Sequence, residues 1–201
     1  KLNLNSKIYF ASKITNSYFH NLSNLDNLKF AFSIAKIFKI KTKLILNTVN
    51  SFKALPYRQE ILFNSKKLII INDSKSTSFS SSISLLSSYK NIYWILGGLA
   101  KQGDKFKLPK KNFKNIKAYI YGKNNSIFQK KLKNKIKFKK FNNIKDALNS
   151  ILKDAKKNKD KKTIIFSPAA ASFDQFENFE KRGSYFNFII KKTKFINTLN
   201  V

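Results

Sequence analysis

Short apolar runs alternate with helical patterns between residues 61 and 191, and this alternation most limits the folds open to the chain. The runs are too continuously apolar for strands with one exposed face, so they indicate strands that are buried on both faces. The expected strands are Ile61–Asn64, Leu68–Asn72, Ile92–Leu96, Ile116–Tyr121, Ile136–Phe138 and Thr163–Phe166. The expected helices are Phe79–Ser88, Ser126–Leu132, Ile144–Ala155 and Glu177–Lys191. This order predicts an α/β fold with a mostly parallel sheet, in which the first two strands form a hairpin.

The first part of the chain has a different pattern. Ile8–Ala11 is a short apolar stretch that suits an edge strand. From Asn24 onward apolar residues recur three and four positions apart, which predicts a helix, and a second helix is expected over Lys43–Phe52. Pro56 then breaks the pattern and marks a domain boundary. The two expected domains are residues 1–55 and residues 56–201.

The composition excludes several kinds of site. The 201 residues include no Cys, which excludes disulfides, thiolate zinc sites and a Cys nucleophile, and a single His, His20, disfavours a Ser/His/Asp triad. No metal-ligating residues are therefore expected. No apolar run reaches the roughly 18 residues that a membrane span needs, and residues 1–5 have no signal-peptide core. The chain is expected to be cytoplasmic, without a membrane partner, and to be a fragment, since it lacks an initiator Met.

The high positive charge of the chain can reflect either a polyanionic partner or the base composition of the genome. The chain carries 41 Lys+Arg against 10 Asp+Glu, a formal net charge of +31, and such a balance is typical of nucleic-acid-binding proteins. However, only Arg58 and Arg182 are arginines, whereas proteins that read phosphates and bases usually use the planar arginine fork as well. Lys, Asn, Ile and Phe share A/T-rich codons, so genome composition accounts for most of the lysines. A nucleic-acid partner is not expected, and a basic nucleic-acid-binding module stays the alternative from another functional class.

Rare residues are informative in a sequence with this bias. Both arginines, four of the five glycines and six of the ten acidic residues gather in four short segments, which makes these segments the candidates for function. Three of the four follow expected strands, and ligands of open α/β sheets bind where the strands end. The segments are Leu55–Glu60, Asn72–Thr77, Gly97–Asp104 and Ser167–Gly183.

Each segment alone is a weak signal. Asp73–Thr77 offers a carboxylate, three hydroxyls and an ammonium, which suit an anion and a ribose but equally a helix N-cap. Gly97–Lys101 lets the backbone approach a ligand and presents one cation, and Ser167–Ser172 is a turn of small residues that permits close approach. Asp104 stands where a phosphate-binding P-loop would need Lys, so the chain has no such motif.

Together the segments form a pattern whose order and intervals are specific. They read Leu55-Pro56-Tyr57-Arg58-Gln59-Glu60, Asn72-Asp73-Ser74-Lys75-Ser76-Thr77, Leu96-Gly97-Gly98-x-x-Lys101 and Ser167-Pro168-Ala169-x-Ala171-Ser172-Phe173-Asp174-Gln175-Phe176-x-Asn178-Phe179-Glu180-x-Arg182-Gly183. This pattern resembles the Mur ligases of peptidoglycan synthesis over about residues 24 to 201, and the last motif is typical of the members that add D-glutamate. The resemblance implies a Rossmann-like Mur ligase C-terminal domain over residues 56–201, preceded by the helical tail of the central ATPase domain over residues 1–55.

The resemblance also implies part of an ATP site. Arg58 matches an arginine that contacts ATP, although Tyr57 stands where the family usually has His. Asp73 matches the acid that holds the ribose, and Lys75 matches a neighbouring polar contact to ATP.

Two asparagines near the adenine are implied as well. Counting back from Pro56 without gaps places Asn24 and Asn27 on them, whereas His20-Asn21-x-x-Asn24 fits the family's His-Asn-x-x-Asn element literally. We adopt the first register because it also aligns the helix that follows. His20 is then expected to be a loop residue without a catalytic role.

Four residues match positions that bind D-glutamate in the family: Thr77, Lys101, Ser172 and Phe179, the last largely through its backbone. D-glutamate has two carboxylates and an amine, so cations, hydroxyls and main-chain N–H groups suit it. Lys101 is also the expected catalytic residue, because an ammonium there can stabilise charge that develops at the reacting centre.

The implied reaction is an ATP-dependent amide ligation. The carboxylate of UDP-N-acetylmuramoyl-L-alanine is phosphorylated to an acyl phosphate, which the amine of D-glutamate attacks, with Mg²⁺ on the phosphates. The family's UDP-binding domain, P-loop and most Mg²⁺ ligands are missing from this sequence, so the chain, expected to be a monomer, is not expected to catalyse ligation alone. The alternatives are another Mur ligase or a folylpolyglutamate synthase relative, a degenerate remnant, and the nucleic-acid-binding module.

Overall fold

The computed structural model describes residues 13–20, 22–123, 125–157 and 160–192. The chain divides into two compact units, Lys1–Ala54 and Leu55–Val201, called here the helical unit and the α/β unit. The edge strand expected at Ile8–Ala11 lies outside the described residues.

The helical unit contains the two expected helices. A 3₁₀ helix, η1 (Ser17–His20), precedes α2 (Leu22–Ile37) and α3 (Thr42–Ser51), so His20 lies in a helical turn and not in the expected loop. The side-chain amide of Asn16 donates to the carbonyls of Val49 (3.0 Å) and Phe52 (2.8 Å), which ties the start of the unit to the end of α3. The buried apolar residues that hold the unit together are Ile14, Phe19, Leu28, Phe32, Ile45 and Val49.

The α/β unit contains one sheet of six strands. The strands are β1 (Glu60–Asn64), β2 (Leu68–Asn72), β3 (Ile92–Gly97), β4 (Ile116–Tyr121), β5 (Lys137–Phe141) and β6 (Lys162–Phe166). Their order in the sheet is β1-β2-β6-β3-β4-β5; β1 and β2 form the expected antiparallel hairpin, and all other neighbours pair in parallel. The mostly parallel α/β fold is therefore confirmed.

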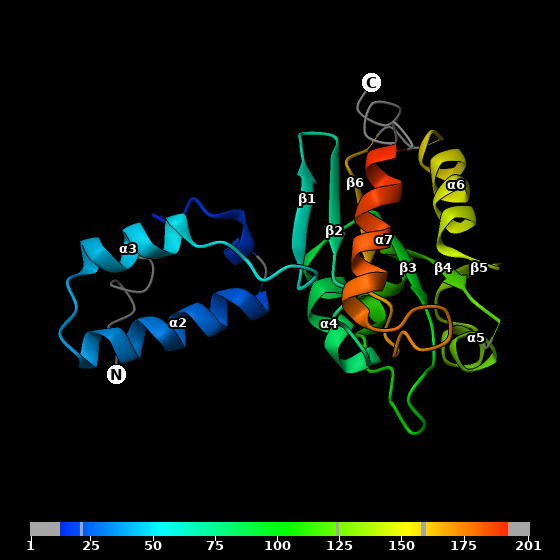
Figure 1. Cartoon of the computed structure of the whole chain (residues 1–201), viewed down its shortest axis with the longest axis horizontal. Coiled ribbons are helices and arrows are strands. Elements are labelled where there is room, and N and C mark those ends of the chain that lie inside the picture. Colours follow the sequence, from blue (N-terminus) through cyan, green and yellow to red (C-terminus); the bar gives the residue numbers. More distant parts are fainter. Residues whose placement is uncertain (1–12, 21, 124, 158–159, 193–201) are drawn as a thin grey trace. The chain divides into compact units, whose positions relative to one another are not determined.

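Helices cover both faces of this sheet (Figure 1). The helices are α4 (Phe79–Ser88), α5 (Ser126–Leu132), α6 (Ile144–Ala155) and α7 (Phe179–Lys192), with a 3₁₀ helix η2 (Lys110–Asn115) before β4. Apolar residues of α6 and α7 form a core with one face of the sheet, and those of α4 and α5 form a core with the other. Every residue of β2, β3 and β6 is buried, which explains why their sequences are continuously apolar.

Local capping fixes where the helices begin. Ser78 and Ser81 form a reciprocal capping box at the start of α4. The side chain of Asn178 accepts a hydrogen bond from the Lys181 N–H (2.7 Å), so α7 begins at Phe179, two residues later than expected.

One expectation about the second half of the sheet needs correction. The strand expected at Ile136–Phe138 runs over Lys137–Phe141. β5 is an edge strand, so its lysines can be exposed to solvent while its backbone stays paired with β4. The stretch 106–115, rich in Lys and Asn, is held against the α/β unit although its composition is typical of a solvated loop or helix end: Leu108 is buried, and Phe106 and Phe113 pack against the core. Apolar side chains spaced among lysines anchor a segment that its charge alone suggests is loose.

Candidate functional site

Three of the candidate segments meet at one edge of the sheet, where β2, β3 and β6 end. β6 lies between β2 and β3, so the loops after all three strands are neighbours. The Asp73 N–H donates to the Phe166 carbonyl (2.7 Å), and the Gly97 N–H donates to the Pro168 carbonyl (3.1 Å). Backbone hydrogen bonds therefore continue past the strand ends into the candidate loops.

The loop that holds Lys101 is fixed on both sides. Leu99 and Ala171 exchange two backbone hydrogen bonds of 2.9 and 3.0 Å, which join it to the loop after β6. On the other side, the Asp104 carboxylate accepts from the Phe79 N–H at the start of α4, next to the segment after β2. The three D-glutamate segments expected from the sequence are thus held by direct contacts.

The expected D-glutamate residues differ in exposure. Thr77 and Lys101 are exposed, whereas Ser172 is only 3% exposed and its carbonyl accepts from the N–H groups of Gln175 and Phe176. Phe179 is half-buried, and its carbonyl accepts from the Ser74 hydroxyl (2.8 Å).

The Asp73 carboxylate accepts hydrogen bonds from other groups of the protein. It accepts from the Ser167 hydroxyl (2.8 Å) and from the Gln59 N–H (3.2 Å), and the side chain is 4% exposed. Burial raises the pKa of Asp73 to about 7, although the hydrogen bonds from Ser167 and Gln59 and the charges of Arg58 and Arg182 act to lower it. The ribose contact that the sequence implies for Asp73 stays a prediction.

A pocket of about 320 Å³ lies beside Arg58 and Lys75, two of the expected ATP contacts. The Lys75 ammonium stands 3.9 Å from the centre of the Phe179 ring, and the Lys75 N–H donates to the Tyr57 carbonyl (3.0 Å). A side chain on Gly183 would come within 2.5 Å of the Tyr57 ring, so this glycine lets Tyr57 pack there. The complete lining is Leu55, Pro56, Tyr57, Arg58, Lys75, Phe179 and Glu180.

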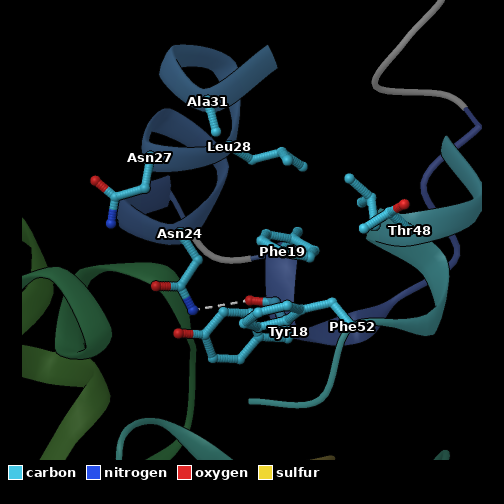
Figure 2. A pocket seen from close by; sticks show the side chains of 9 residues that line it. Tyr18, Phe19, Asn24, Asn27, Leu28, Ala31, Thr48 and Phe52 are labelled. Carbon is cyan, nitrogen blue, oxygen red and sulfur yellow. Dashed lines mark hydrogen bonds between the residues drawn. The ribbon is translucent and has the colours of Figure 1, made fainter. Parts of the chain in front are cut away.

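A second pocket, of about 340 Å³, lies within the helical unit and contains Asn24 and Asn27. Asn24 is 5% exposed and its amide donates to the Tyr18 carbonyl (2.9 Å). Figure 2 shows Asn24 turned toward Tyr18, whereas the amide of Asn27 points away from the aromatic side chains. The remaining lining is apolar or aromatic apart from one hydroxyl: Tyr18, Phe19, Leu28, Ala31, Thr48, Val49 and Phe52. An apolar, aromatic pocket with two asparagines in its lining suits a flat heterocycle.

Sequence reasoning missed one residue at the sheet edge. Arg182 is fully buried and its guanidinium makes three hydrogen bonds, two to Ser74 and one to the Ala170 carbonyl. Arg182 is one of the rare residues of the last motif, but no role was predicted for it. The available signal was its type, because an arginine is exceptional among so many lysines.

The described residues contain no group of three or more His, Cys, Asp or Glu side chains that could hold a metal ion. Among the same residues, no helix has the length and apolar character needed to cross a membrane.

Known proteins resemble the chain in sequence. No family model matches it. The chain is 37% identical over 172 residues to the UDP-N-acetylmuramoylalanine--D-glutamate ligase of Wolbachia sp. subsp. Brugia malayi (strain TRS), an alignment that covers 86% of the chain and 34% of that protein. The ligase of the same name from Rickettsia felis is 35% identical over 170 residues, with 84% of the chain and 38% of that protein covered. The chain therefore spans little more than a third of the length of these relatives.

Solved structures share its fold. The structure of MurF from Acinetobacter baumannii matches with a TM-score of 0.59 at 12% identity, covering 86% of the chain and 38% of MurF. A pseudomurein peptide ligase type C from Methanothermus fervidus matches with a TM-score of 0.53 at 20% identity, covering 86% and 36%. At these identities the likeness concerns the fold alone. The sequence relatives place the chain in the Mur ligase family, as a homologue of a portion of the UDP-N-acetylmuramoylalanine--D-glutamate ligases.

Proposed function

We propose that the chain is the C-terminal portion of a ligase that adds D-glutamate to UDP-N-acetylmuramoyl-L-alanine. In this proposal residues 56–201 are the C-terminal domain, with the D-glutamate site and part of the ATP site, and residues 1–55 are the end of the central ATP-binding domain. The last motif of the sequence and the relatives' names support this member of the family over another Mur ligase or a folylpolyglutamate synthase relative.

One observation carries the D-glutamate assignment: direct contacts hold the segments of Thr77, Lys101 and Ser172 at one sheet edge. Two of these segments carry an exposed side chain, the Thr77 hydroxyl and the Lys101 ammonium, and the third carries the buried Ser172. A ligand with two carboxylates needs such donors. Lys101 is the proposed catalytic residue, because its ammonium can offset the negative charge that develops on the carbonyl oxygen of the acyl phosphate when the D-glutamate amine attacks its carbon.

Each of the two pockets, considered by itself, offers groups that suit one part of ATP. Arg58 and Lys75 offer two cations to phosphates in the α/β unit, and the pocket of Asn24 and Asn27 offers apolar and aromatic surface to the adenine in the helical unit. ATP supplies the phosphoryl group that activates the carboxylate. The Mg²⁺ that accompanies it takes most of its ligands, in this proposal, from the part of the enzyme that this sequence lacks.

Catalysis by this chain alone is not expected, because it has no P-loop to cradle the phosphates. We further propose a monomeric, cytoplasmic protein whose partners are these small molecules and neither nucleic acid nor membrane. Release of phosphate by the 201-residue chain, dependent on UDP-N-acetylmuramoyl-L-alanine and D-glutamate, would contradict the predicted inactivity.

The D-glutamate site is tested by NMR titration of the ¹⁵N-labelled chain. We expect D-glutamate to shift the amide signals of Thr77, Lys101 and Ser172, and Lys101→Ala to weaken binding about tenfold, since a charge-assisted hydrogen bond is lost. Lys133→Ala, which removes another exposed lysine at the end of α5, is the matched control and should bind as the original chain does. Equal weakening by both variants would mean that only the general positive charge attracts the ligand.

A further inference from the structure

We infer that Arg182 is a positioning residue, which holds the loops after β2, β3 and β6 at the spacing that the D-glutamate and ATP contacts require. The inference rests on the proposed function and adds to it a residue that contacts none of the ligands. Arg182 lies in the second turn of α7 and is fully buried.

Two of the three loops are joined by hydrogen bonds from the guanidinium. Nε donates to the Ser74 hydroxyl (3.0 Å) and Nη2 donates to the Ser74 carbonyl (2.7 Å), which fixes the loop after β2. Nη1 donates to the Ala170 carbonyl (3.0 Å) in the loop after β6. Lys75 and Thr77 follow directly after Ser74, and Ser172 follows Ala170 by two residues.

The third loop packs on the same group. A side chain on Gly98 would come within 3.3 Å of Arg182 Nη1 and within 2.3 Å of the Ala171 carbonyl oxygen. Gly98 also has a φ of 120°, which other residues rarely adopt. The loop that holds Lys101 therefore reaches its place only because Gly98 leaves room for the guanidinium and the neighbouring backbone.

Ser74 extends the connection to the start of α7. Its hydroxyl accepts from Arg182 Nε and donates to the Phe179 carbonyl (2.8 Å), one helical turn before Arg182. The Phe179 ring in turn lies under the Lys75 ammonium. Arg182 and Ser74 thus connect the loop after β2, the loop after β6 and the start of α7 by hydrogen bonds.

Lysine cannot replace this arginine. The three acceptors lie in different directions around a planar group, which suits the guanidinium fork, whereas an ammonium is a compact charge with a different geometry. This explains why an arginine is found here in a chain whose other cations are nearly all lysines. Among the described residues, no carboxylate oxygen lies within 4.0 Å of the guanidinium, so its three hydrogen bonds all go to uncharged oxygens of the loops.

The experiment compares Arg182→Lys, Arg182→Gln and Ser74→Ala with Lys181→Gln, an exposed neighbour on α7, by amide hydrogen exchange. We expect exchange to accelerate about tenfold or more at residues 74–77, 99 and 169–172 in the first three variants, while the amides of β3 and β4 stay protected. Lys181→Gln should leave all these rates unchanged. Unchanged rates at the three loops in folded Arg182→Lys, or acceleration spread evenly over the sheet, would overturn the inference.

D-glutamate binding supplies a readout that a purely structural role would not change. Variants that keep the buried fluorescence of Trp94 are folded, and in these we expect affinity for D-glutamate to fall about tenfold or more. Affinity equal to that of Lys181→Gln would overturn the positioning role. If the original chain binds no D-glutamate, the proposed function fails, yet the exchange rates still decide whether Arg182 holds the loops. Should Arg182→Gln not fold, Arg182→Lys and Ser74→Ala give the same test.

Discussion

The α/β unit and the helical unit bury their apolar residues differently. In the α/β unit both faces of the sheet are covered, and Trp94, Phe166 and Tyr119 are completely or almost completely buried. In the helical unit α2 is apolar on two sides: one side packs inward, while Phe30 and Ile37 on the other side are 70% and 77% exposed. A layered sheet buries both faces of its central strands, whereas two helices can cover only one side of each other.

The comparison predicts the largest loss of stability for a core residue of the α/β unit. Phe166→Ala, in β6, removes a fully buried ring that stacks on Phe186 with 4.4 Å between ring centres. We expect the free energy of unfolding to fall by about 3–5 kcal/mol. Urea unfolding followed by the fluorescence of Trp94, the only tryptophan, measures it because Trp94 reports on the α/β unit.

Two controls test the comparison itself. Phe173→Ala removes a ring of the α/β unit that is 70% exposed and should change the free energy of unfolding by less than about 0.5 kcal/mol. Phe32→Ala, in the core of the helical unit, should leave the Trp94 transition unmoved if the two units unfold separately. A shift of that transition would show that the units unfold as one.

The sequence predicted the α/β unit well because local and tertiary forces agree there. Phe79–Ser88, Ile116–Tyr121, Ser126–Leu132 and Ile144–Ala155 have the expected bounds, since each is an apolar pattern with clear ends. The start of α7 was expected two residues too early. The apolar pattern does not show that Asn178 caps the helix, or that turns closed on the Ser172 carbonyl precede it.

The candidate site was predictable only in part. Rare residues after strands located the loops of Asp73, Lys101 and Ser172, because strand ends of a parallel sheet share an edge. The hydrogen bonds that join those loops were not predictable, since Arg182 and Ser74 are 108 residues apart. Nor does any local pattern reveal that Asp73 is buried and already holds two donors.

The second prediction concerns the pH dependence of stability, which should differ between the units because the α/β unit buries an acidic side chain. The pKa of Asp73 is raised from 3.8 to about 7, so at intermediate pH the folded chain holds a proton that the unfolded chain has released. Stability of the α/β unit should therefore fall as pH rises from about 4 to about 7, by about 2–4 kcal/mol in all. Trp94-detected urea unfolding across this range measures the slope.

Asp73→Asn is the variant that isolates this effect. It should flatten the slope without abolishing it, because burial also raises the pKa of Asp174 and gives the same sign. The helical unit contains neither Asp73 nor Asp174, so the exchange rates of α2 and α3 amides, corrected for intrinsic pH dependence, should show little of the slope. A slope that Asp73→Asn leaves unchanged would mean that Asp73 is ionised in the folded chain.

The smallest effects on stability are expected when one carboxylate is removed from each unit, that of Asp154 or that of Asp26. Asp154, with a side chain 9% exposed, accepts from the Tyr119 hydroxyl (2.6 Å) and from the ammonium groups of Lys117 (3.0 Å) and Lys139 (2.9 Å). Burial alone would raise the pKa of Asp154, but these hydrogen bonds lower it well below its usual range. Asp154→Asn should cost about 1–2 kcal/mol at neutral pH, and the difference from the original chain should shrink as pH falls below about 4.

The matched acid of the helical unit is Asp26, whose bond to Lys29 (2.8 Å) joins two exposed side chains. Asp26→Asn should change stability by at most about 0.5 kcal/mol, measured by amide exchange in α2, because water screens an exposed ion pair. The geometry of the two acids is alike, with ammonium groups at hydrogen-bonding distance, so burial is what separates them. Equal costs for both variants would mean that water screens the ion pairs of Asp154 as strongly as that of Asp26. The units would then differ only in how they bury apolar residues.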